Sequence, residues 1–77
     1  MADAIERYLD DLGRLLTVAP ATRTAILDEV RSHLATAAAA QAAEGADPAM
    51  AEAQAIMAFG AVGQAAMRFN AVHPLYW

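Results

Sequence analysis

Glu29 and His33 are the two residues whose types and spacing come closest to a chemical site in this 77-residue chain. Their separation within the segment 23–34 places both side chains on one face of a helix, where a carboxylate and an imidazole could share a metal ion. A zinc site needs about three or four protein ligands, whereas His73 is the only other histidine and the chain has no cysteine. The spacing therefore favours an exposed histidine beside a carboxylate, and we expect no metal site.

Other catalytic arrangements find no support in the sequence. Asp28 and Glu29 are adjacent, and neighbours in a helix point about 100° apart, so they do not form a shared-proton pair of carboxylates. The only serine, Ser32, is next to His33 in sequence and therefore does not face it. No glycine-rich phosphate loop follows a strand. We expect a protein that is not an enzyme and holds no cofactor.

Charge and composition exclude further kinds of function. The net charge is −4, and all five basic residues are arginines that are scattered along the chain. Binding to phosphate groups needs clustered cations, so we expect no direct contact with nucleic acid. The absence of cysteine excludes disulfides and thiolate metal sites.

The sequence predicts neither a signal peptide nor a membrane span. Asp3 and Glu6 stand where a signal peptide has its basic region. The longest uncharged stretch, 53–67, is interrupted by Gly60 and Gly63 and is shorter than the roughly 20 residues that cross a bilayer. We expect a cytoplasmic protein, either on its own or as the cytoplasmic domain of a membrane protein whose membrane segment lies beyond this sequence.

The spacing of apolar residues predicts helices and no strands. The first segment has one apolar stripe, formed by Ile5, Tyr8, Leu9, Leu12, Leu15 and Leu16. Helices are expected over about 3–16, 20–44, 48–59 and 62–71. The predicted fold is all-α: a small antiparallel bundle of three main helices plus a short C-terminal helix, which forms a single domain over residues 1–77.

Residues at the expected helix ends support these boundaries. Asp3 with Glu6 forms a capping-box-like pair at the start of the first helix. Gly45 suits the position that follows the second helix. Asp47 before Pro48 is typical of a helix start, because aspartate caps free amides and proline fits the first turn.

The large apolar residues are few, so the core is expected to be small and helped by self-association or by a partner. That core is expected to be filled by Met50, Met57 and Met67 with Phe59 and Phe69, with a plastic binding groove as the alternative. Ala35–Ala43 is strongly helical but buries little surface, and two such smooth faces can pack closely in a homodimer. The tyrosine and tryptophan at 76–77 either fold back on the bundle or border a membrane segment beyond this sequence.

Several short motifs resemble those of the HAAS signalling domain and of the similar N-terminal prefix domain of some bacterial ABC-type efflux permeases. The similarity covers about residues 5–70 and lies in Tyr8, Leu9, Leu12, Leu15, Arg23, Ile26, Leu27, Glu29, Ser32, His33, Leu34, Glu44, Gly45, Ala53, Phe59 and Gly60. After Phe59-Gly60 that family tends to have a polar or acidic residue and a proline, whereas Ala61-Val62-Gly63 stands here. The last helix is therefore expected to lack a good cap.

The resemblance implies a bacterial, cytoplasmic helical module, often placed ahead of transmembrane helices and frequently encoded beside a PadR-type transcriptional regulator. Such a module would bind the regulator and couple a membrane or envelope signal to gene expression.

Four residues of the second helix, Arg23, Glu29, Arg31 and His33, are our candidates for the polar contacts with this partner. The plainer interpretation is that they are solvated charges, with Arg31 paired to Asp28 within the helix. The alternative function is a homo-oligomeric structural module that packs through the alanine-rich part of the second helix.

Overall fold

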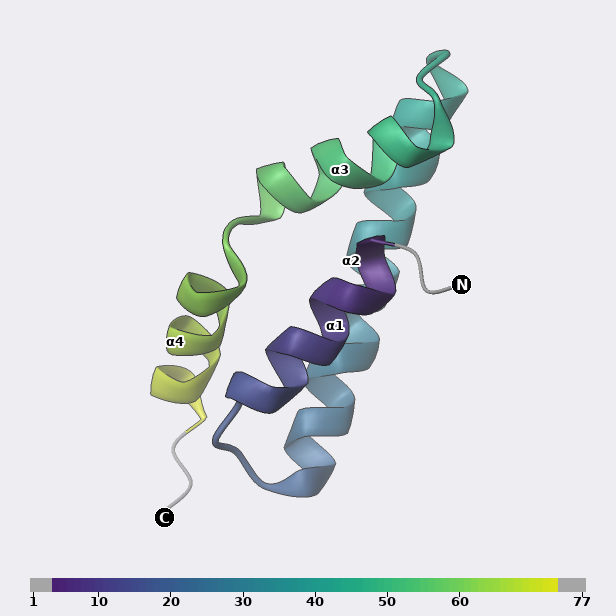
Figure 1. The fold of residues 1–77 in the computed structure, drawn as a ribbon. Coiled ribbons are helices and arrows are strands. Elements are labelled where there is room, and N and C mark those ends of the chain that lie inside the picture. The colour runs from purple at the N-terminus through teal and green to yellow at the C-terminus, as the bar shows by residue number, and fades with distance from the viewer. Residues whose placement is uncertain (1–3, 74–77) are drawn as a thin grey trace.

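The computed structural model describes residues 4–73, which form four helices and no strand (Figure 1). The helices are α1 (Ala4–Leu15), α2 (Pro20–Ala43), α3 (Pro48–Phe59) and α4 (Val62–Val72). The predicted all-α class is confirmed. The ends that the structure describes fall within one residue of the predicted ends. Asp3, the expected cap of the first helix, and the aromatic pair at 76–77 lie outside the described residues.

Local interactions set the helix boundaries. The Asp47 carboxylate accepts a hydrogen bond of 3.1 Å from the amide of Ala49, which caps the start of α3. Gly60 ends α3 with φ of +120°, a conformation that a residue with a Cβ adopts only under strain. The Ala61 side chain forms no capping hydrogen bond at the start of α4, as its sequence predicts.

The helices are arranged around α1, which contacts each of the other three. It runs antiparallel to α2, and α3 returns across both of them (Figure 1). The chain changes direction at Gly60 and Ala61, so that α4 descends along α1 (Figure 1). Within the described part of the chain, the backbone of α4 lies close to α1 and not to α2 or α3.

The core lies where α1 meets the first half of α2, with α3 and α4 closing it. Its larger members are Ile5, Tyr8, Leu9, Leu12, Leu16, Val18, Ile26, Val30 and Leu34. Leu12 and Leu34 are completely buried. Leu15 was predicted to belong to the buried stripe but is half-exposed, because α1 ends there and Leu16 enters the core instead.

The second half of α2 extends past α1, since its 24 residues span about 36 Å and the 12 residues of α1 span about 18 Å. We call α2 from Ala35 to Ala43 and the part of α3 up to Ala55 the alanine arm. Ala51 and Ala55 are the buried residues on its α3 side. This arm gives the molecule its elongated outline of 46 × 23 × 17 Å.

Candidate functional site

Arg23, the first of the four predicted contact residues, is directed towards the interior. Its Nη2 donates a hydrogen bond of 3.4 Å to the carbonyl oxygen of Leu16. Its Nε is shielded from solvent and has no hydrogen-bond partner among the described residues. This guanidinium therefore ties the start of α2 to the segment that follows α1.

Arg31 forms an ion pair between helices. Its Nε and Nη2 each donate to a different oxygen of the Glu6 carboxylate at 3.1 Å, and Nη1 lies 3.5 Å from Asp28. The hydrogen bond to Glu6, the negative charge of that carboxylate and the more distant Asp28 raise the pKa of Arg31. The predicted pairing with Asp28 within the helix is present, but the contact with α1 is the shorter one.

His33 belongs to a set of rings that joins three helices. Its ring centroid lies 5.5 Å from that of Phe59 on α3, and the Phe59 ring meets Tyr8 of α1 edge to face at 6.0 Å. The Tyr8 hydroxyl donates a hydrogen bond of 2.8 Å to the carbonyl oxygen of Gly60. We call Tyr8, His33 and Phe59 the aromatic junction. It accounts physically for the Phe59-Gly60 motif, because both residues hold the end of α3 against α1.

Burial also changes the chemistry of Tyr8. Removal of the phenol from water raises its pKa above the ordinary value of 10.0, and the nearby positive charge of Arg68 acts in the opposite direction. Tyr8 is therefore a neutral hydrogen-bond donor at physiological pH.

The structure brings two of the four predicted residues together. Glu29 and His33 are exposed one turn apart on one flank of α2, and Glu29 forms no hydrogen bond or ion pair within residues 4–73. Arg31 lies on the opposite flank, facing α1, while Arg23 lies on the core side. The four residues therefore do not form one continuous patch. Their contact with a partner stays a prediction.

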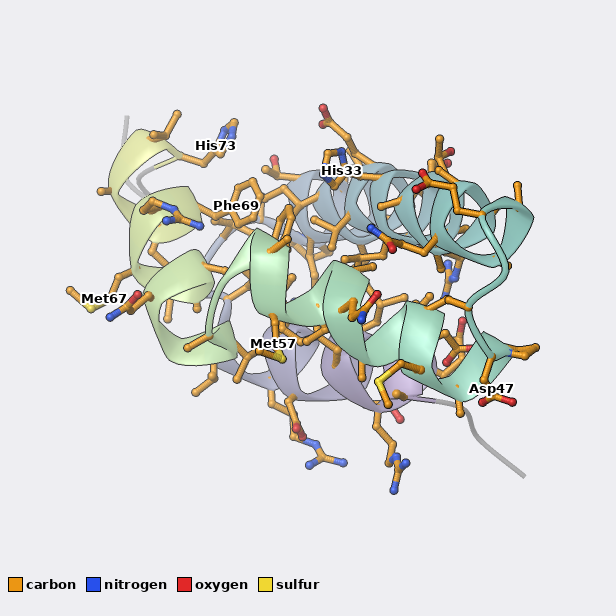
Figure 2. All side chains as sticks on the ribbon, turned by 90° about the horizontal axis from the view of Figure 1, so that it is seen from above. His33, Asp47, Met57, Met67, Phe69 and His73 are labelled. Atoms are coloured by element: carbon orange, nitrogen blue, oxygen red, sulfur yellow. The ribbon has the colours of Figure 1, made fainter. Side chains whose placement is uncertain are left out.

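Three methionines that were predicted to lie in the core are exposed instead. Met50, Met57 and Met67 are 55%, 80% and 72% exposed, so the prediction that they fill the core is wrong. Phe59 and Phe69 do pack against the core. In α3 the inner positions are taken by small residues, Ala51 and Ala55. Figure 2 shows Met57 and Met67 projecting from the surface of α3 and α4.

One side of α3 forms an apolar surface that no other helix within residues 4–73 covers. Met50, Ala53 and Met57 recur at helical spacing on this side, with Gln54 beside them, and all four are exposed. We call these four residues the methionine face. Figure 2 shows Met57 well apart from His33, on either side of the α3 axis. The sequence alone did not reveal this face, because α3 is apolar on every side and the burial of Ala51 and Ala55 that defines its inner side comes from the structure.

The part of the chain that the structure describes has no pocket and no group of three side chains suited to a metal ion. Over the same residues, no helix has the length and apolar character to cross a membrane. Comparison of the chain with known protein families, with curated proteins and with solved structures gives no match. The resemblance to the HAAS domain therefore stays a prediction.

Proposed function

We propose that this chain is a regulatory protein–protein interaction module that docks onto another protein. The observation that carries the proposal is the methionine face, where Met50 and Met57 are 55% and 80% exposed on the same side of one helix. Burial of a methionine side chain is worth about 1.5–3 kcal/mol. In this chain two methionines stay in water and add nothing to the stability of its small core. A partner that covers them adds their burial to the free energy of binding.

Methionine also suits this role chemically. Its unbranched, polarizable side chain adapts to partners of different shape, and surfaces that bind other proteins often use it. Ala53 between Met50 and Met57 is small, so a partner's side chain can approach α3 closely between the two methionines.

The scaffold holds the methionine face in place before a partner arrives. The Asp47 cap fixes the start of α3, and the aromatic junction with the Tyr8–Gly60 hydrogen bond fixes its end. A helix anchored at both ends loses little conformational freedom on binding, which favours affinity.

The resemblance to the HAAS domain supplies the identity of the partner that we propose: a PadR-type transcriptional regulator, so that the module couples a membrane or envelope signal to gene expression. Glu29 and His33 are the candidates for additional polar contacts, because both are exposed. Arg23 and Arg31 contribute to the fold through Leu16 and Glu6.

A co-purification tests this function. The tagged chain is recovered from its host, bound proteins are identified by mass spectrometry, and the captured regulator is then purified and titrated with the chain. We expect Met50→Ser with Met57→Ser to weaken that binding about tenfold or more while the helical circular dichroism is unchanged. Met67→Ser, which is 72% exposed but lies on α4, is the control. Recovery of the chain alone would contradict the proposal.

A second candidate function is a homo-oligomeric assembly module that packs through α2. It is supported by Ala39, Ala40, Ala42 and Ala43, which are all exposed on the alanine arm. In that case the melting temperature rises with protein concentration, and Ala42→Glu produces monomers. Ala38→Glu is a poorer test because Ala38 is partly buried against the core. A melting temperature independent of concentration would exclude this function.

A further inference from the structure

The methionine face exposes reactive sulfur atoms to solvent. Met57 has the largest exposed fraction of the exposed large hydrophobic residues that the structure describes, and Figure 2 shows it projecting from α3. Met50 lies about two helical turns before it on the same side. The sequence has no cysteine, so methionine thioethers are its only sulfur groups. An oxidant that reacts with sulfur therefore meets these side chains without competition from a thiol of the same chain.

Oxidation at these positions does not reach the interior. The buried side chains of residues 4–73 are those of leucine, isoleucine, valine, alanine and tyrosine, and none is a methionine. Methionine oxidation damages protein cores because a buried sulfoxide is a polar group without a partner. Here a sulfoxide stays in water on the outer side of α3, which keeps its Asp47 cap and the Tyr8–Gly60 hydrogen bond. We therefore expect the fold to survive a reaction that changes its surface.

Gln54 places a hydrogen-bond donor beside both sulfur positions. It follows Met50 by four residues and precedes Met57 by three, and both separations bring side chains together on a helix surface. Its amide has two N–H donors and forms no hydrogen bond within residues 4–73. A sulfoxide is polar, whereas a thioether sulfur accepts hydrogen bonds only weakly. Gln54 therefore favours the oxidised form of its two neighbours.

We propose that Met50 and Met57 form a reversible oxidation site, at which a hydroperoxide changes the methionine face from apolar to polar. In the forward reaction the thioether sulfur attacks one oxygen of the peroxide, so that an S–O bond forms and the O–O bond breaks. Sulfur loses two electrons, and hydrogen peroxide is reduced to water. In the reverse reaction a methionine sulfoxide reductase restores the thioether, two thiols become a disulfide, and the oxygen leaves as water.

The consequence for binding rests on the proposed docking function, whereas the modification itself does not. A partner that covers the methionine face removes two apolar thioethers from water, which is favourable. After oxidation the same partner has to desolvate two polar sulfoxides. We expect the oxidised chain to bind the captured PadR-type regulator about tenfold or more weakly than the reduced chain. Peroxide then releases the partner while the chain stays folded.

The first test needs no partner. The purified chain is treated with hydrogen peroxide, both folded and in urea, and peptide mass spectrometry follows the oxygen added at each methionine. We expect Met57 and Met50 of the folded chain to react within about threefold of their rates in urea, because folding leaves them exposed. The oxidised chain is expected to keep its free energy of unfolding and its helical circular dichroism. It is expected to elute earlier from a phenyl hydrophobic-interaction column, because its surface is more polar.

Matched variants separate the two methionines of this face from the others. Met50→Leu with Met57→Leu keeps apolar side chains of similar size and removes both reactive sulfur atoms. Met67→Leu removes the exposed sulfur of α4 instead. Met1 is present in both variants, so its oxidation affects them alike. After peroxide, Met67→Leu is expected to lose the regulator and to regain it with methionine sulfoxide reductases and a dithiol, whereas the double variant binds throughout.

Other results overturn the proposal. Oxidation of Met50 and Met57 slower than in urea by more than about tenfold would show that the fold shields them. Lower stability after oxidation would make the reaction damage, and unchanged column retention would show that the face stays apolar. Equal loss of the regulator in the double variant, or no loss in the wild-type chain, would exclude the switch. If no regulator is captured, the proposed function fails, while mass spectrometry, unfolding and column retention still decide whether the oxidation site exists.

Discussion

Leu34 and Ala51 are almost equally buried, at 0% and 1% exposure, yet they lie in regions of different construction. Leu34 packs in the main core between α1 and α2, among branched and aromatic side chains. Ala51 packs in the alanine arm, outside that main cluster of buried residues, and it contributes a single methyl group. Equal burial therefore corresponds to unequal stabilisation, since the hydrophobic gain scales with the apolar area removed from water.

The difference extends to the charges. The main core is bordered by the Arg31–Glu6 pair between α1 and α2, whereas the alanine arm contains no ion pair among its described residues. The arm therefore depends on the intrinsic helix preference of alanine and on close backbone packing. The two regions are therefore stabilised in different ways, and the four predictions below test that contrast.

The largest effect is expected from Leu12→Ala in the main core. Leu12 is completely buried, and truncation of a buried leucine costs about 2–5 kcal/mol through lost transfer energy and the cavity that remains. Urea unfolding followed by circular dichroism gives the change in the free energy of unfolding. A loss below about 1 kcal/mol would show that this region is not the main source of stability.

Ala51→Gly probes the arm and is expected to cost about 1–2 kcal/mol. About 1 kcal/mol of this comes from the lower helix preference of glycine, and the rest from loss of a buried methyl group. Ala53→Gly is the matched control, because Ala53 is exposed on the same helix and loses only the helix preference. If the two variants are equally destabilised in urea, the packing of the arm contributes nothing.

The helix boundaries could be predicted because each is marked locally. Pro20, Pro48 and Gly60 interrupt or start helices through their own backbone chemistry, whatever surrounds them. The burial of α3 could not be predicted in the same way. Its residues are apolar on every side, so periodicity alone did not separate the alanines that face α2 from Met57, which faces water.

The contacts of the candidate site depend on tertiary structure. Glu6 and Arg31 are 25 positions apart, and only the alignment of α1 against α2 brings them to 3.1 Å. Phe59 and His33 were both noted as parts of a motif, but the sequence did not show that their rings meet. Where the sequence suggested a single polar patch on α2, the packing of α1 and α3 on opposite flanks divided it.

Tyr8→Phe is expected to cost about 0.5–1.5 kcal/mol, because it removes the hydrogen bond to Gly60 and leaves that carbonyl unpaired while keeping the ring. The raised pKa of Tyr8 adds a dependence on pH. The neutral Tyr8 phenol contributes its full stabilisation below pH 10.0, the ordinary pKa of tyrosine. This stabilisation is lost as the pH rises through the higher pKa of the folded state, because the tyrosine of the unfolded chain ionises first. Urea unfolding at pH 8 and at about pH 10.5 measures this loss. The loss of unfolding free energy between the two pH values should be smaller in Tyr8→Phe. An equal loss in both proteins would show that the pH dependence comes from other groups.

The smallest effect is expected for the Arg31–Glu6 ion pair, which borders the main core and has no counterpart among the described residues of the alanine arm. The Glu6 and Arg31 side chains are 44% and 48% exposed, so solvent screens their interaction and we expect a coupling energy of only about 0.2–1 kcal/mol. A double-mutant cycle with Glu6→Gln and Arg31→Gln isolates this coupling from the contact between Arg31 and Asp28, which both Arg31 variants lose equally. The coupling should decrease at about 1 M salt, because the charges are then screened within a few ångströms. A coupling energy above about 2 kcal/mol that salt does not change would contradict this expectation. It would show that the greater stability of the main core comes from charge as well as from leucine packing.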